Sequence, residues 1–130
     1  MLLLTTLITT NAMIFDCHFY NASNVVDENI FYVCEATVTQ TDNERVLEKV
    51  HGAHHKGRNN QDVDGLIVQN QTLMKIPLKI DKFFPHLQFV QLENTSLEMI
   101  SLGDFKQLPN LRYFKAVNNK LTHLDDNSFK

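Results

Sequence analysis

This sequence of 130 residues lacks the features that mark several large classes of protein. It has no tryptophan, and its only thiols are two cysteines. Its formal net charge is −3 at pH 7 and its basic side chains are scattered, so the chain has no positively charged surface of the kind that binds nucleic acid. No apolar run reaches the roughly 18 residues that cross a bilayer. The length fits one domain, with neither nucleic acid nor a membrane span expected.

Catalytic motifs are also missing. The chain has no glycine-rich phosphate loop, no G-x-S-x-G turn and no H-E-x-x-H pair. Asp125 and Asp126 are neighbours in sequence, so their carboxylates do not converge on one point as a general acid and base must. A solvated turn after Leu124 explains this pair better. We expect no enzymatic activity and no cofactor.

The C-terminal half instead contains a repeat. Three stretches align in steps of 24 residues, and each predicts a short strand at its third to fifth positions. Apolar residues recur in five columns of this alignment: Val63, Leu87 and Leu111; Leu66, Val90 and Phe114; Val68, Leu92 and Ala116; Leu73, Leu97 and Leu121; Ile76, Ile100 and Leu124. The spacing follows L-x-x-L-x-L-x-x-N-x-L, so this half resembles a leucine-rich-repeat array.

The N-terminal part predicts an antiparallel hairpin between residue 14 and about residue 39. The run IFYVCEATV alternates, with Phe31, Val33 and Glu35 on one side and Tyr32 and Cys34 on the other. An even number of cysteines in an apparently exported chain suggests a Cys17–Cys34 disulfide across this hairpin. The alternative is a pair of buried free thiols. A further short strand is predicted around residues 45–50.

Export is suggested by the N-terminus and by three glycosylation motifs. Residues 1–12 contain a short apolar stretch followed by small polar residues and Ala12, as in a signal peptide, although no Lys or Arg precedes the stretch. The alternative is a frayed terminus or a truncated gene model. N-x-S/T motifs occur at Asn21, Asn70 and Asn94, and they become glycosylation sites only in the secretory route. We expect a secreted glycoprotein.

The stretch from His55 to Ile100 looks like the start of the array in secreted insect leucine-rich-repeat proteins that carry a two-cysteine N-terminal cap. This resemblance implies an α/β solenoid: a horseshoe segment of short parallel strands, capped by the disulfide-linked hairpin. It divides the chain into a candidate signal peptide (residues 1–12), a cap with a polar connection (13–62) and repeats (63–130). The repeats are 63–86, 87–110 and an incomplete 111–130.

The resemblance also implies an extracellular recognition module whose concave face binds a protein ligand of unknown identity. The candidate ligand-binding residues are Ile67, Phe89, Gln91, Glu93, Arg112, Tyr113 and Lys115. Aromatic side chains beside an arginine have the composition of an interface hot spot. The alternative is that single exposed aromatic residues are ordinary on any surface.

Three alternatives remain open. The chain is an N-terminal piece of a membrane-anchored receptor, or it self-associates through the apolar face of its last repeat. A hypothesis of another class is a small metal-binding protein that uses His51, His54 and His55, with His18 as a further ligand. Gly52 lies among these histidines and argues for a solvated loop rather than a helix, so we assign no metal site.

Overall fold

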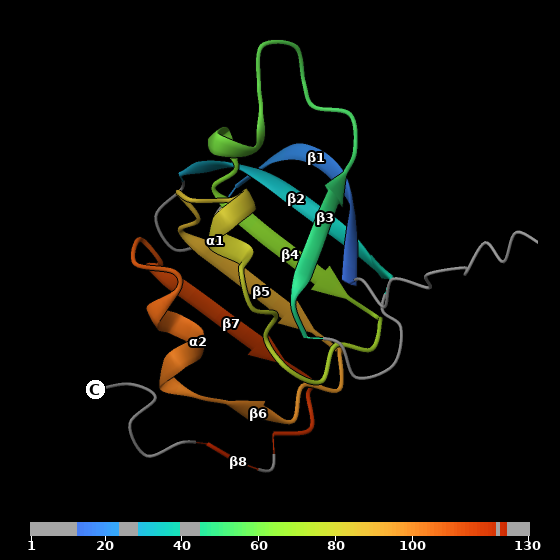
Figure 1. Ribbon diagram of the computed structural model, residues 1–130, viewed down its shortest axis with the longest axis vertical. Coiled ribbons are helices and arrows are strands. Elements are labelled where there is room, and N and C mark those ends of the chain that lie inside the picture. Colours follow the sequence, from blue (N-terminus) through green and yellow to red (C-terminus); the bar gives the residue numbers. More distant parts are fainter. Residues whose placement is uncertain (1–12, 24–28, 40–44, 122, 125–130) are drawn as a thin grey trace, which may run out of the picture.

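The protein is built around one sheet of six strands in the order β3-β1-β2-β4-β5-β7 (Figure 1). The computed structural model describes residues 13–23, 29–39, 45–121 and 123–124. The strands of the sheet are β1 (Met13–Ser23), β2 (Ile30–Thr39), β3 (Leu47–His51), β4 (Gly65–Gln69), β5 (Phe89–Glu93) and β7 (Tyr113–Val117). The candidate signal peptide and the Asp125–Asp126 pair lie outside the described residues.

Little else in the described chain is regular. A second sheet of two strands pairs β6 (Met99–Ile100) with β8 (His123–Leu124). The helices are short: the 3₁₀ turn η1 (Asn60–Asp62), α1 (Ile80–Phe83) and α2 (Leu102–Lys106). Within the described residues, no helix is long and apolar enough to span a membrane.

The sheet is mixed. β1 and β2 pair antiparallel as the sequence predicts, whereas β3 pairs parallel with β1, and β4, β5 and β7 continue parallel to β2. The spacing of 24 residues appears in the register, because Gly65 pairs with Phe89 and Phe89 with Tyr113. The three parallel strands therefore begin at the predicted third position of each stretch.

The predicted horseshoe solenoid is nevertheless wrong. The hairpin is not a separate cap, because β2 pairs directly with β4 and the described strands form a mixed sheet with almost no helix. The Gln71 side chain extends this junction beyond the last backbone pair: Val38 N–H donates to its Oε1 at 2.7 Å, and its Nε2 donates to the Ala36 carbonyl at 2.7 Å. Backbone hydrogen bonding therefore continues from the hairpin into the parallel strands.

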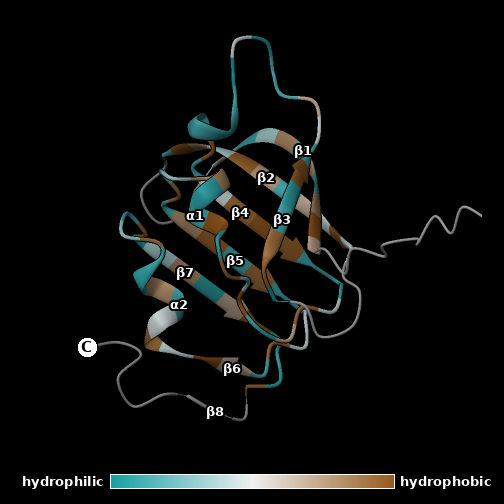
Figure 2. Ribbon diagram, viewed as in Figure 1, coloured by the Kyte–Doolittle hydropathy of each residue, from teal (hydrophilic) through white to brown (hydrophobic). Residues whose placement is uncertain are grey.

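One face of this sheet is covered. Alternate residues of every strand point into a continuous core, which also takes in Ile80 of α1 and Leu108 after α2. Both helices lie over this face (Figure 1), and hydrophobic residues gather in the strands while the loop after β3 is mainly hydrophilic (Figure 2). The predicted apolar columns supply much of this core, and Val63, Leu66, Val68 and Leu97 are fully buried.

The predicted disulfide is present and buried. Cys17 and Cys34 lie diagonally across β1 and β2, with their Cα atoms 5.1 Å apart. Both side chains point into the core. Closing a loop of this length stabilises the fold by about 3 kcal/mol in the chain-entropy model.

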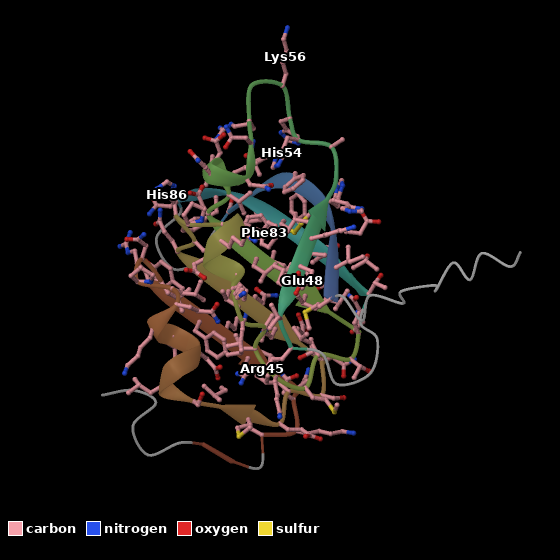
Figure 3. The ribbon with its side chains drawn as sticks, viewed as in Figure 1. Arg45, Glu48, His54, Lys56, Phe83 and His86 are labelled. Atoms are coloured by element: carbon pink, nitrogen blue, oxygen red, sulfur yellow. A yellow bond between two sulfur atoms is a disulfide. The ribbon has the colours of Figure 1, made fainter. Side chains whose placement is uncertain are left out.

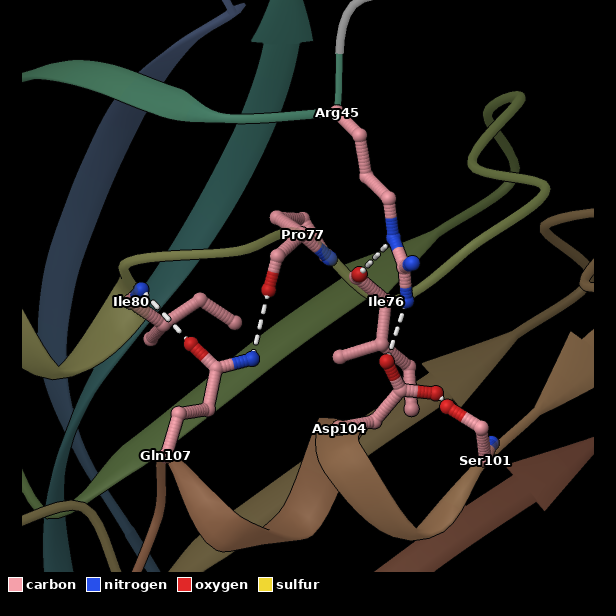
Figure 4. Close-up of polar contacts among 7 residues, drawn as sticks. All are labelled: Arg45, Ile76, Pro77, Ile80, Ser101, Asp104 and Gln107. Atoms are coloured by element: carbon pink, nitrogen blue, oxygen red, sulfur yellow. Dashed lines mark hydrogen bonds and ion pairs between the residues drawn. The ribbon is translucent and has the colours of Figure 1, made fainter.

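A buried polar contact ties β3 to α2 on the covered face. Arg45 forms a salt bridge with Asp104, which is 2% exposed, and its Nε donates to the Ile76 carbonyl at 2.9 Å (Figure 4). Ser101 N–H donates to Asp104 at 2.8 Å and begins α2 as an N-terminal cap. Because the carboxylate is paired and hydrogen-bonded, its burial is offset.

Candidate functional site: the open face of the sheet

The opposite face of the sheet, here called the open face, is formed by the other alternate residues of the same strands. The pairing registers align them into rows that cross the sheet. The first row is Tyr20, Val33, Gly65, Phe89 and Tyr113, and the second is His18, Glu35, Ile67, Gln91 and Lys115. Neither helix lies over this face, which leaves much of both rows accessible.

Three rings form an aromatic patch on the open face: Phe31, Phe89 and Tyr113. Phe31 stacks on Phe89 with ring centroids 6.0 Å apart, and Tyr113 meets Phe31 edge-on at 6.4 Å. The Arg112 guanidinium lies 5.5 Å from the Tyr113 ring centroid, within reach of a cation–π interaction. Phe89 and Tyr113 are half-buried and Arg112 is exposed. An apolar surface with a directional charge at its edge results.

The patch depends on the absence of a side chain at Gly65. A Cβ there would lie 2.7 Å from Val33 Cγ1 and 3.0 Å from Phe89 Cδ1. Glycine weakens a strand interior because it loses more backbone entropy on folding. At this position that cost allows Phe89 to lie against Val33 and to reach Phe31 on β2.

The second row is polar. Tyr20 Oη donates to Glu35 Oε1 at 2.9 Å. Burial, this hydrogen bond and the negative charge of Glu35 raise the pKa of Tyr20 to about 12. Toward β7, Gln91 Nε2 donates to Glu93 Oε2 at 3.4 Å, and Lys115 is exposed. The open face therefore changes from aromatic to charged within one row.

The structure places the seven predicted ligand-binding residues on or beside the open face with one difference. Ile67 is only 8% exposed, because it packs into a small cluster with Phe31 and Val33. It supports the patch from below and is not available to a ligand. The sequence interpretation omitted Phe31, Tyr20 and Glu35 from the site, although the alternation in residues 30–38 already placed Phe31 and Glu35 on one side.

The histidines have structural contacts instead of a shared ligand site. His54, on the loop after β3 (Figure 3), stacks on Phe19 with centroids 3.8 Å apart. Its Nδ1 lies 2.9 Å from Tyr32 Oη and its Nε2 lies 2.7 Å from Asn60 Oδ1. His55 Nε2 instead meets the Phe19 carbonyl at 3.0 Å. Among the described residues, no three His, Cys, Asp or Glu side chains are grouped closely enough to hold a metal ion.

The three candidate glycosylation sites are exposed at strand ends. Asn21 lies near the end of β1, and Asn70 and Asn94 follow β4 and β5 with left-handed φ values of 56° and 53°. Asn94 Nδ2 donates to Asn70 Oδ1 at 3.0 Å. Asn70 and Asn94 thus lie side by side at one margin of the open face.

Comparison with known proteins does not identify this chain. No family model matches it, and no solved structure matches it significantly. Function must therefore be argued from the surface itself.

Proposed function

We propose that this protein is a non-enzymatic extracellular module that binds a protein ligand through the open face of its sheet. The observation that carries this proposal is the aromatic patch of Phe31, Phe89 and Tyr113 with Arg112 at its edge, on a face that neither helix covers. Aromatic residues and arginine are enriched where protein interfaces derive most of their binding energy.

The extracellular part of the proposal is supported by the disulfide. Cystine bridges persist in oxidising compartments and are rare in the cytosol, where thiols are kept reduced. Cys17 and Cys34 form a buried bridge, which is compatible with secretion.

Capture of purified extracellular proteins by the immobilised chain tests the binding surface. Replacing Phe89 and Tyr113 with alanine should weaken capture by about tenfold or more, because each truncation removes an aromatic contact. Both rings are half-buried, so the double variant should lose about 2 kcal/mol of stability and still fold. Met74→Ala is the matched control, since Met74 is 40% exposed and lies in the loop after β4. Unchanged capture by the folded double variant rules out the open face.

Expression from Met1 in insect cells tests secretion. Non-reducing intact mass of medium and lysate, with and without glycosidase, should find a secreted chain that lacks its leader and carries glycan. Its mass should be two hydrogens lower, as a Cys17–Cys34 bridge requires. A full-length, unmodified chain retained in the cells with free thiols contradicts secretion.

A further inference from the structure

The last strand of the sheet, β7, leaves one side of its backbone open. β5 lies on its inner side, and no described strand lies on its outer side. Tyr113 N–H donates inward to the Gln88 carbonyl at 3.0 Å, and the Val117 carbonyl accepts from Asn94 N–H at 2.9 Å. Backbone groups alternate sides along a strand, so the N–H and C=O groups of Phe114 and Ala116 face outward.

This edge has few of the features that prevent strand pairing. β7 contains no proline, and its register with β5 runs without a bulge. Phe114 and Ala116 are half-buried, and Phe114 packs edge-on against Phe105 of α2 with centroids 5.1 Å apart. An added strand would extend both the hydrogen bonding of the sheet and its apolar core.

The charge around this edge has one sign. Residues 111–121 contain Arg112, Lys115 and Lys120 and no acidic residue, and Arg112 and Lys115 are exposed. A second copy is a poor occupant. An antiparallel register that uses the outward groups of both Phe114 and Ala116 places Lys115 opposite the same lysine, and like charges directly opposite are destabilising.

We propose that the outer edge of β7 binds an extended, acidic segment of a partner protein, which adds to the sheet as a further strand. Backbone hydrogen bonds to Phe114 and Ala116 provide the docking. Alternate side chains of the segment then lie on the open face, with an acidic residue beside Lys115 and an apolar one beside Tyr113. This inference rests on the proposed binding function and names the class of partner and its mode of docking.

Synthetic peptides test the edge directly. The probe is a short fluorescent peptide that alternates valine with glutamate, compared with its valine–lysine counterpart by fluorescence anisotropy. We expect the glutamate peptide to bind more tightly, and to weaken as salt is added. Two versions of it carry N-methyl groups on one or the other alternate set of amides. One set should reduce affinity by about tenfold, because its donors face β7, and the other set should not. Equal binding of both versions overturns strand addition.

Two variants of the full chain complete the test. Ala116→Pro removes an outward N–H without removing a bond to β5, and it should weaken peptide binding by about tenfold. Lys115→Glu is at an exposed position, should keep the fold and should reverse the preference between the two peptides. An unreversed preference overturns the proposal, as does a wild-type dimer that Ala116→Pro abolishes.

The outcomes separate this inference from the proposed function. If neither peptide binds while alanine at Phe89 and Tyr113 still weakens ligand capture, the edge is wrong and the open face stands. If the peptides bind at the edge and capture is unaffected by those alanines, the open face is wrong.

Discussion

The covered and open faces of the sheet use alternate residues of the same strands and are completed differently. On the covered face, the core is closed by both short helices, the buried Cys17–Cys34 bridge and the Arg45–Asp104 salt bridge. On the open face, the fully packed side chains are the small cluster of Phe31, Val33 and Ile67. The covered face therefore provides most of the stability, and the open face is left for recognition.

The sharpest way to test this comparison uses two adjacent residues of β5. Leu92 points into the core and is 1% exposed, whereas Gln91 lies half-buried on the open face. Leu92→Ala should lower the free energy of unfolding by about 4 kcal/mol through lost burial and a cavity. Gln91→Ala should change it by less than about 1 kcal/mol. Urea unfolding measures both, and equal losses would contradict the division of roles.

Removing the disulfide tests how far the covered face depends on a covalent link. Replacing Cys17 and Cys34 together with alanine should lower the free energy of unfolding by about 3 kcal/mol, because the unfolded chain gains the entropy of an open loop. Urea unfolding under non-reducing conditions measures the loss. Wild-type protein in reducing agent is the control and should show a similar loss; an effect near zero would contradict a stabilising bridge.

Gly65→Ala probes the open face from within. The new Cβ would crowd Val33 and Phe89, so we expect a loss of about 2 kcal/mol where alanine in a strand ordinarily stabilises. Thermal unfolding measures this loss. A Val33→Ala/Gly65→Ala double variant should recover part of it relative to Val33→Ala alone. A stabilising Gly65→Ala would show that the patch does not require the close approach.

The smallest expected effect is the titration of Tyr20. The unfolded chain releases this proton near the ordinary pKa of 10.0, whereas the folded protein keeps it to about 12. The contribution of Tyr20 to stability is therefore complete below pH 10.0 and is lost as the pH rises toward 12. Ultraviolet absorbance of the phenolate, with Tyr20→Phe as the reference, should assign this late titration. Glu35→Gln should lower the pKa of Tyr20, and an unchanged titration would contradict the role of Glu35.

Local patterns in the sequence predicted much of the secondary structure. Alternation located the hairpin, an even cysteine count suggested the bridge, and the spacing of 24 residues located the starts of β4, β5 and β7. The fold class failed because spacing identifies neighbours within the repeated part and does not identify what pairs with its first strand. The β2–β4 pairing joins residues about thirty apart that share no pattern.

The site was predicted less completely for the same reason. The burial of Ile67 depends on Phe31, Val33 and Phe89, which come from two other strands. The Arg45–Asp104 salt bridge joins residues 59 apart in the chain, with no sequence signal at either position. His54 was a candidate metal ligand by spacing alone, whereas its stacking on Phe19 depends on the path of the loop.

The position of β2 in the sheet has a consequence in time. Its pairing partner β4 lies later in the chain, beyond the whole stretch between Thr39 and Gly65. A hairpin forms in roughly microseconds, whereas a ribosome adds about 5–20 residues per second. The newborn β1–β2 ribbon therefore waits roughly one to five seconds with one edge unpaired. During that interval the apolar side chains of Phe31, Tyr32 and Val33 lack the neighbours that later bury them, so the protein is most prone to aggregate before its synthesis is complete.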